Sequence, residues 1–221
     1  MRSLAMMSVD LARYLQTRVD AQQAPHEEAM NTPKRYFELW DDLHIPGRWH
    51  LSTPDVDETG REIDPWQFKD GVVVTLGAAP LLRMSHPGRA LDFTLTGLTV
   101  PLVHGRAVSL FKRLSLDQEV QFIPTHVEGF TEPYFLLNAL RIIRCIDDAR
   151  CEEVLYWLPE DNRPDKEGQY RNVRGMKVDP EKVGDANVFR PWGWTAVLIV
   201  SERVKRAMEN EGITGPRFVE V

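Results

Sequence analysis

Two segments of the chain repeat the same order of apolar strand, amphipathic helix and second strand, and this repeat constrains the fold more than any other feature. The first segment reads PLVHGRAVSLFKRL and continues into VQFIP, and the second reads LIVSERVKRAMENE and continues into PRFVE. Val103 matches Val200 at an offset of 97 residues, and Arg106 has its match at the same offset. The pattern predicts a duplicated strand-helix-strand unit, unless two amphipathic helices resemble each other by chance.

Apolar periodicity and turn residues predict the other elements. Helices are expected at 104–114 and 202–210, the second with Ser201 as its N-cap and Gly212 at its end. Strands are expected at 72–76, 81–84, 93–95, 120–124, 134–146, 195–200 and 218–221. Residues 134–146 contain no Gly or Pro and read as one long central strand. We therefore expect an α+β fold with mixed, largely antiparallel sheets and a few packed helices.

The chain is predicted to have a short appended segment and one larger domain. Apolar residues recur every three or four positions over 4–23, which predicts an amphipathic helix ending near Pro25. Residues 1–30 would form this appended helix, and residues 31–221 an α+β domain. The repeat leaves open whether that domain consists of two fused halves, at about 31–128 and 129–221.

Charge and hydropathy argue against several classes of protein. The 221 residues include 27 Lys and Arg against 33 Asp and Glu, a net charge of -6, whereas general nucleic-acid binders need a basic excess. The longest apolar runs are far shorter than the roughly 20 residues that cross a bilayer. Asp10 interrupts the first apolar stretch, so no secretory signal is indicated. We expect a cytoplasmic protein that binds neither nucleic acid nor membranes.

Catalytic and metal-binding motifs are missing from the sequence. None of the six histidines lies in a zinc-protease or deaminase pattern, and the glycines form no phosphate-binding loop. We therefore expect no catalytic residue, no metal and no cofactor. An uncharacterised hydrolase that uses His44 and His50 with Asp41 or Asp42 remains the alternative.

The two cysteines do not form a metal-binding pattern. Cys145 and Cys151 are separated by IDDAR, which is neither a CxxC pair nor part of a four-ligand zinc site. We expect both to be reduced, structural thiols, although an oxidising compartment would allow a disulfide across this short turn.

The acidity is concentrated in two stretches that also contain aromatic residues. Residues 38–70 have a net charge of -6 and residues 147–167 a net charge of -5. Carboxylates speed the encounter with a basic partner, and aromatic anchors supply much of the binding energy of a protein interface. Both stretches are therefore candidate docking surfaces for a basic protein, the alternative being that they are ordinary solvated loops.

The end of the chain resembles a known family. Its ending SERVKRAMENEGITGPRF follows the pattern SE, helix, GITG-x-x-F, and YFLLN, RYFELWDD and PGRWHL occur earlier. These motifs resemble the bacterial polymorphic-toxin immunity proteins, over about residues 34–221.

This resemblance implies a non-enzymatic antidote that binds and neutralises a cognate toxin. Because the ending reads as core and turn residues, we expect the toxin to contact residues outside it. The candidate toxin-binding residues lie in the second acidic stretch: Tyr156, Trp157, Glu160, Asp161, Asp165 and Glu167. A general protein-interaction scaffold is the other alternative. The sequence leaves open the toxin's identity and the oligomeric state.

Overall fold

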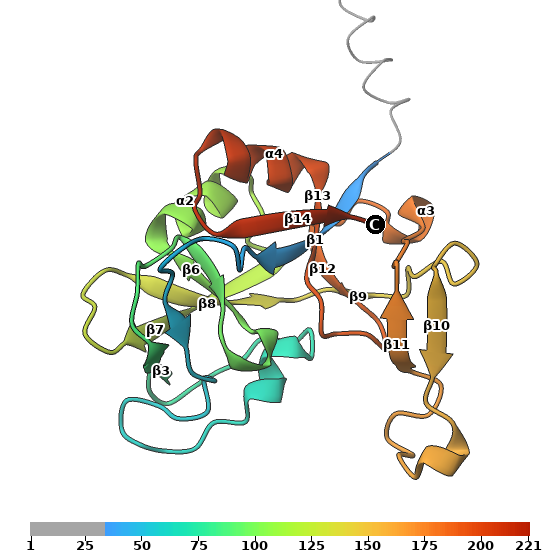
Figure 1. Cartoon of the computed structure of the whole chain (residues 1–221), viewed down its shortest axis with the longest axis horizontal. Helices are drawn as coiled ribbons and strands as arrows, with labels where there is room; N and C mark the ends of the chain where they lie inside the picture. Colours follow the sequence, from blue (N-terminus) through green and yellow to red (C-terminus); the bar gives the residue numbers. More distant parts are fainter. Residues whose placement is uncertain (1–33) are drawn as a thin grey trace, which may run out of the picture. The chain divides into compact units, whose positions relative to one another are not determined.

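Two five-stranded sheets contain most of the strands of residues 34–221, the part of the chain that the computed structural model describes (Figure 1). The first sheet has the order β14 (Pro216–Glu220), β1 (Tyr36–Asp41), β13 (Ile199–Ser201), β12 (Val188–Pro191) and β9 (Ile142–Ile143). The second has the order β3 (Leu81–Leu82), β7 (Val120–Val127), β8 (Tyr134–Ala139), β6 (Pro101–His104) and β5 (Phe93–Leu95). Within these sheets only the β12–β9 and β3–β7 pairs are parallel, so the predicted α+β class with largely antiparallel sheets is confirmed. The helix predicted over 4–23, with the appended segment 1–30, lies outside the described residues.

The predicted repeat has the same connections in both sheets. Helix α2 (Gly105–Arg113) joins β6 to β7, and helix α4 (Glu202–Asn210) joins β13 to β14. In each unit a third strand lies between the two joined strands and antiparallel to both, β8 in one and β1 in the other. Strand β1 belongs to the first predicted half, 31–128, and β8 belongs to the second, 129–221. If the two halves are units of a duplication, each half therefore contributes one strand to the sheet of the other.

The main hydrophobic core lies between the sheets and the two helices. Strand residues alternate between faces, so Phe37 and Leu39 of β1 point into this core while Tyr36 points to the opposite side. Helix α2 buries Phe111 and helix α4 buries Met208 in the same cluster. Two further clusters lie on the other faces of the sheets, so β1, β7 and β8 each have residues in two of the three clusters.

The ends of α4 are where the sequence predicts them. The Ser201 hydroxyl accepts a hydrogen bond from the Val204 amide at 3.5 Å, which satisfies one of the free donors of the first turn. Gly212 follows the last turn with a φ of +64°, a conformation that glycine adopts without steric cost. Helix α2 begins in the same way, with the His104 ring nitrogen accepting from the Arg106 amide.

Two expected strands are wrong. Residues 72–76 form no strand, because the Val74 amide and carbonyl both bond to the side-chain amide of Gln121, at 2.9 and 2.7 Å, in place of a neighbouring strand. The expected strand at 134–146 breaks after Ala139. There the Leu140 amide donates to the Glu119 carbonyl at 2.8 Å, and the chain crosses from the second sheet to the first, where β9 pairs with β12.

The last strand before α4 is shorter than expected. Residues 192–196 turn, with Gly193 at a φ of +75° and the Trp194 amide donating to the Pro191 carbonyl, so β13 begins only at Ile199. Among the described residues, no helix combines the length and hydropathy needed to cross a bilayer.

Candidate functional site

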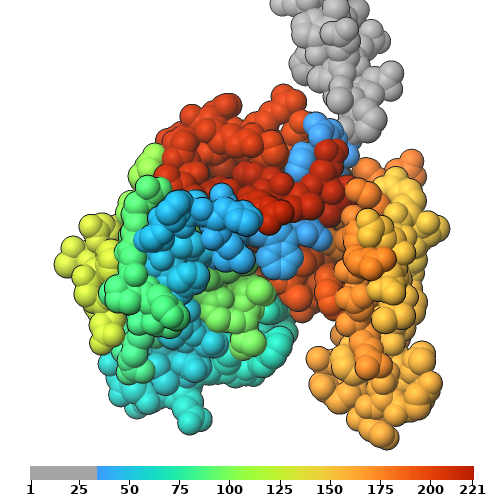
Figure 2. All heavy atoms as spheres, viewed as in Figure 1, coloured from blue at the N-terminus to red at the C-terminus, as the bar shows by residue number. Residues whose placement is uncertain are grey.

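The six predicted toxin-binding residues lie on a single projecting hairpin. Strands β10 (Glu153–Tyr156) and β11 (Tyr170–Arg174) pair antiparallel, and the segment between them contains the short helix η3 (Pro159–Asp161). Figure 1 shows the hairpin extending away from the two large sheets, and in Figure 2 its outer part, in orange, stands clear of the body. The structure therefore brings the candidate residues together on one exposed element.

Two tyrosines and an aspartate join the strands of this hairpin. The Tyr170 hydroxyl donates to the Asp148 carboxylate at 2.8 Å, the Tyr156 hydroxyl donates to the same carboxylate, and the two rings lie 5.1 Å apart. The hydrogen bond to Asp148 raises the pKa of Tyr156, while burial and then Asp148 raise that of Tyr170. Tyr156 is 38% exposed, so its ring edge remains available although its hydroxyl is occupied.

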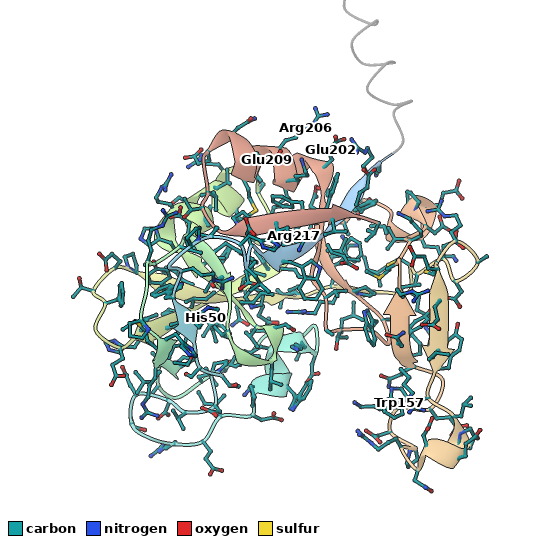
Figure 3. All side chains as sticks on the ribbon, viewed as in Figure 1. His50, Trp157, Glu202, Arg206, Glu209 and Arg217 are labelled. Carbon is teal, nitrogen blue, oxygen red and sulfur yellow. The ribbon has the colours of Figure 1, made fainter. Side chains whose placement is uncertain are left out.

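Cations surround the Trp157 ring near the end of the hairpin, where Figure 3 labels it. The charged groups of Arg163, Lys166 and Arg171 lie 5.8, 5.5 and 5.4 Å from a ring centroid of this indole. Such contacts are attractive because the face of an indole is electron-rich. Trp157 therefore holds the connecting segment together, in addition to any contact that it makes with a partner.

Two of the four predicted carboxylates are already paired within the hairpin. Asp161 accepts from the Leu158 amide at 2.9 Å and from Arg171 at 2.8 Å. Asp165 accepts two hydrogen bonds from Arg163, at 2.9 and 2.8 Å, and these bonds lower the pKa of its carboxyl. Much of the negative charge in this stretch is thus neutralised locally.

The hairpin also has exposed acidic and apolar side chains. Glu160 and Glu167 are exposed, and within the described part of the chain their carboxylates have no hydrogen bond or ion pair. Leu155 and Leu158 of the same hairpin are each 48% exposed. We call Leu155, Tyr156, Leu158, Glu160 and Glu167 the hairpin surface. Sequence reasoning missed the two leucines, although apolar residues within an acidic, turn-rich stretch were the available signal.

The residues of the alternative hydrolase site lie partly in an open groove of about 780 Å³. Asp41 and His50 line it together with His86, whose ring centroid is 5.6 Å from that of His50 (Figure 3 labels His50). Asp41 forms a buried ion pair with Arg48, and the same guanidinium donates to the Thr94 hydroxyl at 2.7 Å. Asp41 thus holds an arginine in place and makes no hydrogen bond to any histidine of residues 34–221.

Asp42 and His44, the other residues of the alternative hydrolase site, do not line this groove. Asp42 accepts from the backbone amide of His44 at 2.9 Å, a local turn bond. Across residues 34–221, no group of three or more His, Cys, Asp or Glu side chains is placed to hold a metal ion. Cys145 and Cys151 are both free thiols.

A protein-family model matches most of the chain. The family model described as Immunity protein family (Imm11) matches residues 21–221. The matched span includes both sheets and the hairpin. It begins at residue 21, earlier than the resemblance over about residues 34–221 that the sequence motifs indicate. No curated protein matches the chain.

Proposed function

Because the chain belongs to the immunity protein family Imm11, we propose that it is the antidote of a cognate polymorphic toxin. It binds the toxin in the cytoplasm and blocks it without catalysis. The family match over residues 21–221 is the observation that carries this proposal.

The hairpin surface is the proposed toxin-binding site. Its two leucines and the Tyr156 edge supply apolar area that a partner can bury, and buried apolar and aromatic contacts supply most of the affinity of protein interfaces. Glu160 and Glu167 have no internal partner, so their charges are available to attract a basic toxin. Asp161 and Asp165 act indirectly, by fixing the shape of the segment between the strands.

We propose a protein partner, with no role for nucleic acid or membranes. The net charge of -6 disfavours association with phosphate groups and anionic lipids. The pairing of Asp41 with Arg48 favours the antidote over a hydrolase, because Asp41 then orients Arg48 and no carboxylate of residues 34–221 forms a hydrogen bond with His50.

The direct test is protection against a defined toxin. The toxin domain encoded beside this chain is expressed in a bacterial host, alone and together with the full chain. We expect growth only with the full chain, and a complex of the two purified proteins by isothermal titration. Binding without protection would indicate a scaffold, and failure of both binding and protection would reject the antidote proposal.

Matched variants test the location of the site. Glu160→Lys with Glu167→Lys reverses two unpaired charges and should lower the association rate constant for a basic toxin by about tenfold or more at low salt. The control, Glu128→Lys with Glu132→Lys, reverses two exposed carboxylates outside both acidic stretches.

A second pair of variants separates apolar contact from charge. Leu155→Ser with Leu158→Ser should weaken the complex by roughly 2 kcal/mol or more through a faster dissociation rate. The control, Val73→Ser, changes a valine that is 67% exposed and lies outside the hairpin. Circular dichroism confirms that each variant is folded. Equal affinities for all variants would place the site elsewhere.

A further inference from the structure

Strand β7 is paired along the whole of one side but along only part of the other. Strand β8 lies on the first side, whereas β3 pairs with the second side only at His126 and Val127 (Figure 1). Among the described residues, no strand pairs with this second side between Val120 and Thr125. An unpaired strand edge presents backbone donors and acceptors, so it can accept a further strand.

The direction of the backbone groups shows which of them are free at this edge. The His126 amide donates to the Pro80 carbonyl at 2.9 Å, so the even-numbered residues of β7 face away from β8. Phe122 therefore presents its N–H and C=O at the unpaired edge, and Pro124 presents its C=O. None of these three groups has a hydrogen-bond partner within residues 34–221.

A groove of about 370 Å³ lies at the same edge. Residues 121–124 of β7 form one wall, and the segment 74–79, which leads into β3, forms the other. This segment is attached at both ends, because the Val74 backbone bonds to the side-chain amide of Gln121 and the Pro80 carbonyl bonds to β7. Between the two attachments the segment does not pair with β7, and the groove remains open.

The lining of the groove defines the chemistry of a segment that fits it. Its side chains are apolar or neutral, and none of them is charged. A charged side chain would lose hydration in the groove without gaining a partner, so uncharged side chains are favoured. The wall opposite β7 includes the small residues Ala78 and Ala79, which leave room for the side chains of an added strand.

We propose that this groove binds a short, extended and uncharged segment of a partner protein, which adds a strand to β7. The backbone of the segment pairs with the N–H and C=O of Phe122 and donates to the C=O of Pro124. Its uncharged side chains contact the walls of the groove. The hairpin surface is not part of this site, so the proposal does not rest on the proposed function.

The first test measures hydrogen exchange of the Phe122 amide by NMR in the full wild-type chain. Without a ligand, this amide should exchange faster than that of Ile123, which faces β8. The probe is a pentapeptide of alternating threonine and valine with acetylated and amidated ends. At a peptide concentration ten times Kd, exchange at Phe122 should be about tenfold slower, because only the unliganded fraction exchanges.

Matched variants and a matched peptide test where and how the probe binds. Ala78→Glu places a carboxylate in the groove and should weaken binding by about tenfold or more. Ala149→Glu makes the same change at an exposed position outside the groove and should keep the wild-type affinity. The same peptide N-methylated on every residue can donate no backbone hydrogen bond, and it should also bind about tenfold more weakly or worse.

Each of the other outcomes overturns the proposal. Slow exchange at Phe122 in the unliganded protein would mean that the edge is already paired. Exchange that slows with protein concentration alone would mean that a second copy of the chain occupies the edge. A peptide without effect on Phe122, or equal binding by wild type and Ala78→Glu, or by the two peptides, would show that the groove does not accept an added strand.

Discussion

Asp92 and Thr214 are joined by three hydrogen bonds although they are 122 residues apart. The Thr214 amide and hydroxyl donate to the Asp92 carboxylate at 3.0 and 2.9 Å, and the same hydroxyl accepts from the Asp92 amide at 3.0 Å. Arg106 of α2 donates to this carboxylate as well, at 3.0 Å. The GITG turn after α4 is therefore tied to the strand that begins at Phe93, which gives the turn a structural role.

Removing the Thr214 hydroxyl should destabilise the fold. Thr214→Val keeps the shape of the side chain but leaves the largely buried Asp92 with fewer partners, at a cost of about 1–3 kcal/mol in the free energy of unfolding. Thr214→Ser keeps the hydroxyl and should cost less than half as much. Urea unfolding followed by tryptophan fluorescence measures both, and equal losses would contradict the role assigned to the hydroxyl.

Gly215 should tolerate no side chain. Its φ is +105°, and a Cβ built there would lie 2.0 Å from the Phe93 carbonyl oxygen. Gly215→Ala must displace that strand, so we expect a loss of more than about 3 kcal/mol or failure to fold. Gly212→Ala is the control, because Gly212 also has positive φ but nothing lies within 4 Å of its Cβ position. Its loss should be about 1 kcal/mol.

The paired and unpaired carboxylates of the hairpin should differ in their effect on local order. Asp161→Asn weakens the bonds to the Leu158 amide and to Arg171, and should speed hydrogen exchange of amides between β10 and β11. Glu160→Gln removes a charge without a partner and should leave those rates unchanged. Exchange measured by mass spectrometry over residues 157–169 distinguishes the two. Equal acceleration would mean that Asp161 does not fix the segment.

Stability should depend on pH through Lys69. Its pKa is lowered from 10.5 to about 8 by burial and by Arg190, so between these values the unfolded chain binds more protons than the folded one. The free energy of unfolding should then rise across pH 8 to 10.5, by up to about 3 kcal/mol.

Lys69→Met isolates this effect from other groups. Tyr36 and Tyr134, whose pKa values burial raises to about 12, titrate in both proteins and cancel in the difference. Urea unfolding at several pH values gives the difference directly. A constant difference between wild type and variant over this range would contradict the prediction.

The two thiols should be unreactive in the folded protein. Burial raises the pKa of Cys145 to about 12 and also raises that of Cys151, so little thiolate is present at neutral pH. We expect Ellman's reagent to react slowly with the native protein and to detect both thiols, Cys145 and Cys151, in guanidinium without reductant. Fewer thiols in guanidinium would indicate a disulfide.

The sequence predicts helix α4 well because its signals are local. Ser201, the apolar spacing over 202–210 and Gly212 all lie within a few turns of one another. The broken strand at 134–146 could not be predicted in the same way. Its interruption depends on Glu119 and on β12, which no local pattern of Leu, Ile and Phe identifies.

The candidate site also combines features that the sequence predicts with features that depend on the fold. Composition directs attention to residues 147–167, because acidity and aromatic residues are sequence properties. The pairing of Asp161 with Arg171 and the cations around Trp157 required the folded hairpin. That the buried residues Lys69 and Arg190 lie close enough to repel each other could not be predicted either, since nothing in the sequence connects these two positions.

The place of β1 between β13 and β14 has a consequence for synthesis. Tyr36 pairs with Ser201 and Asp41 pairs with Pro216, so the first sheet cannot form completely until residues 216–220 have left the ribosome. Contacts between such distant residues also slow folding, because a long loop must close before they form. If synthesis stops before residue 199, strand β1 lacks both of its neighbours, β13 and β14. Such an incomplete chain has unpaired strand edges and exposed apolar residues, so it is open to proteolysis and prone to aggregation.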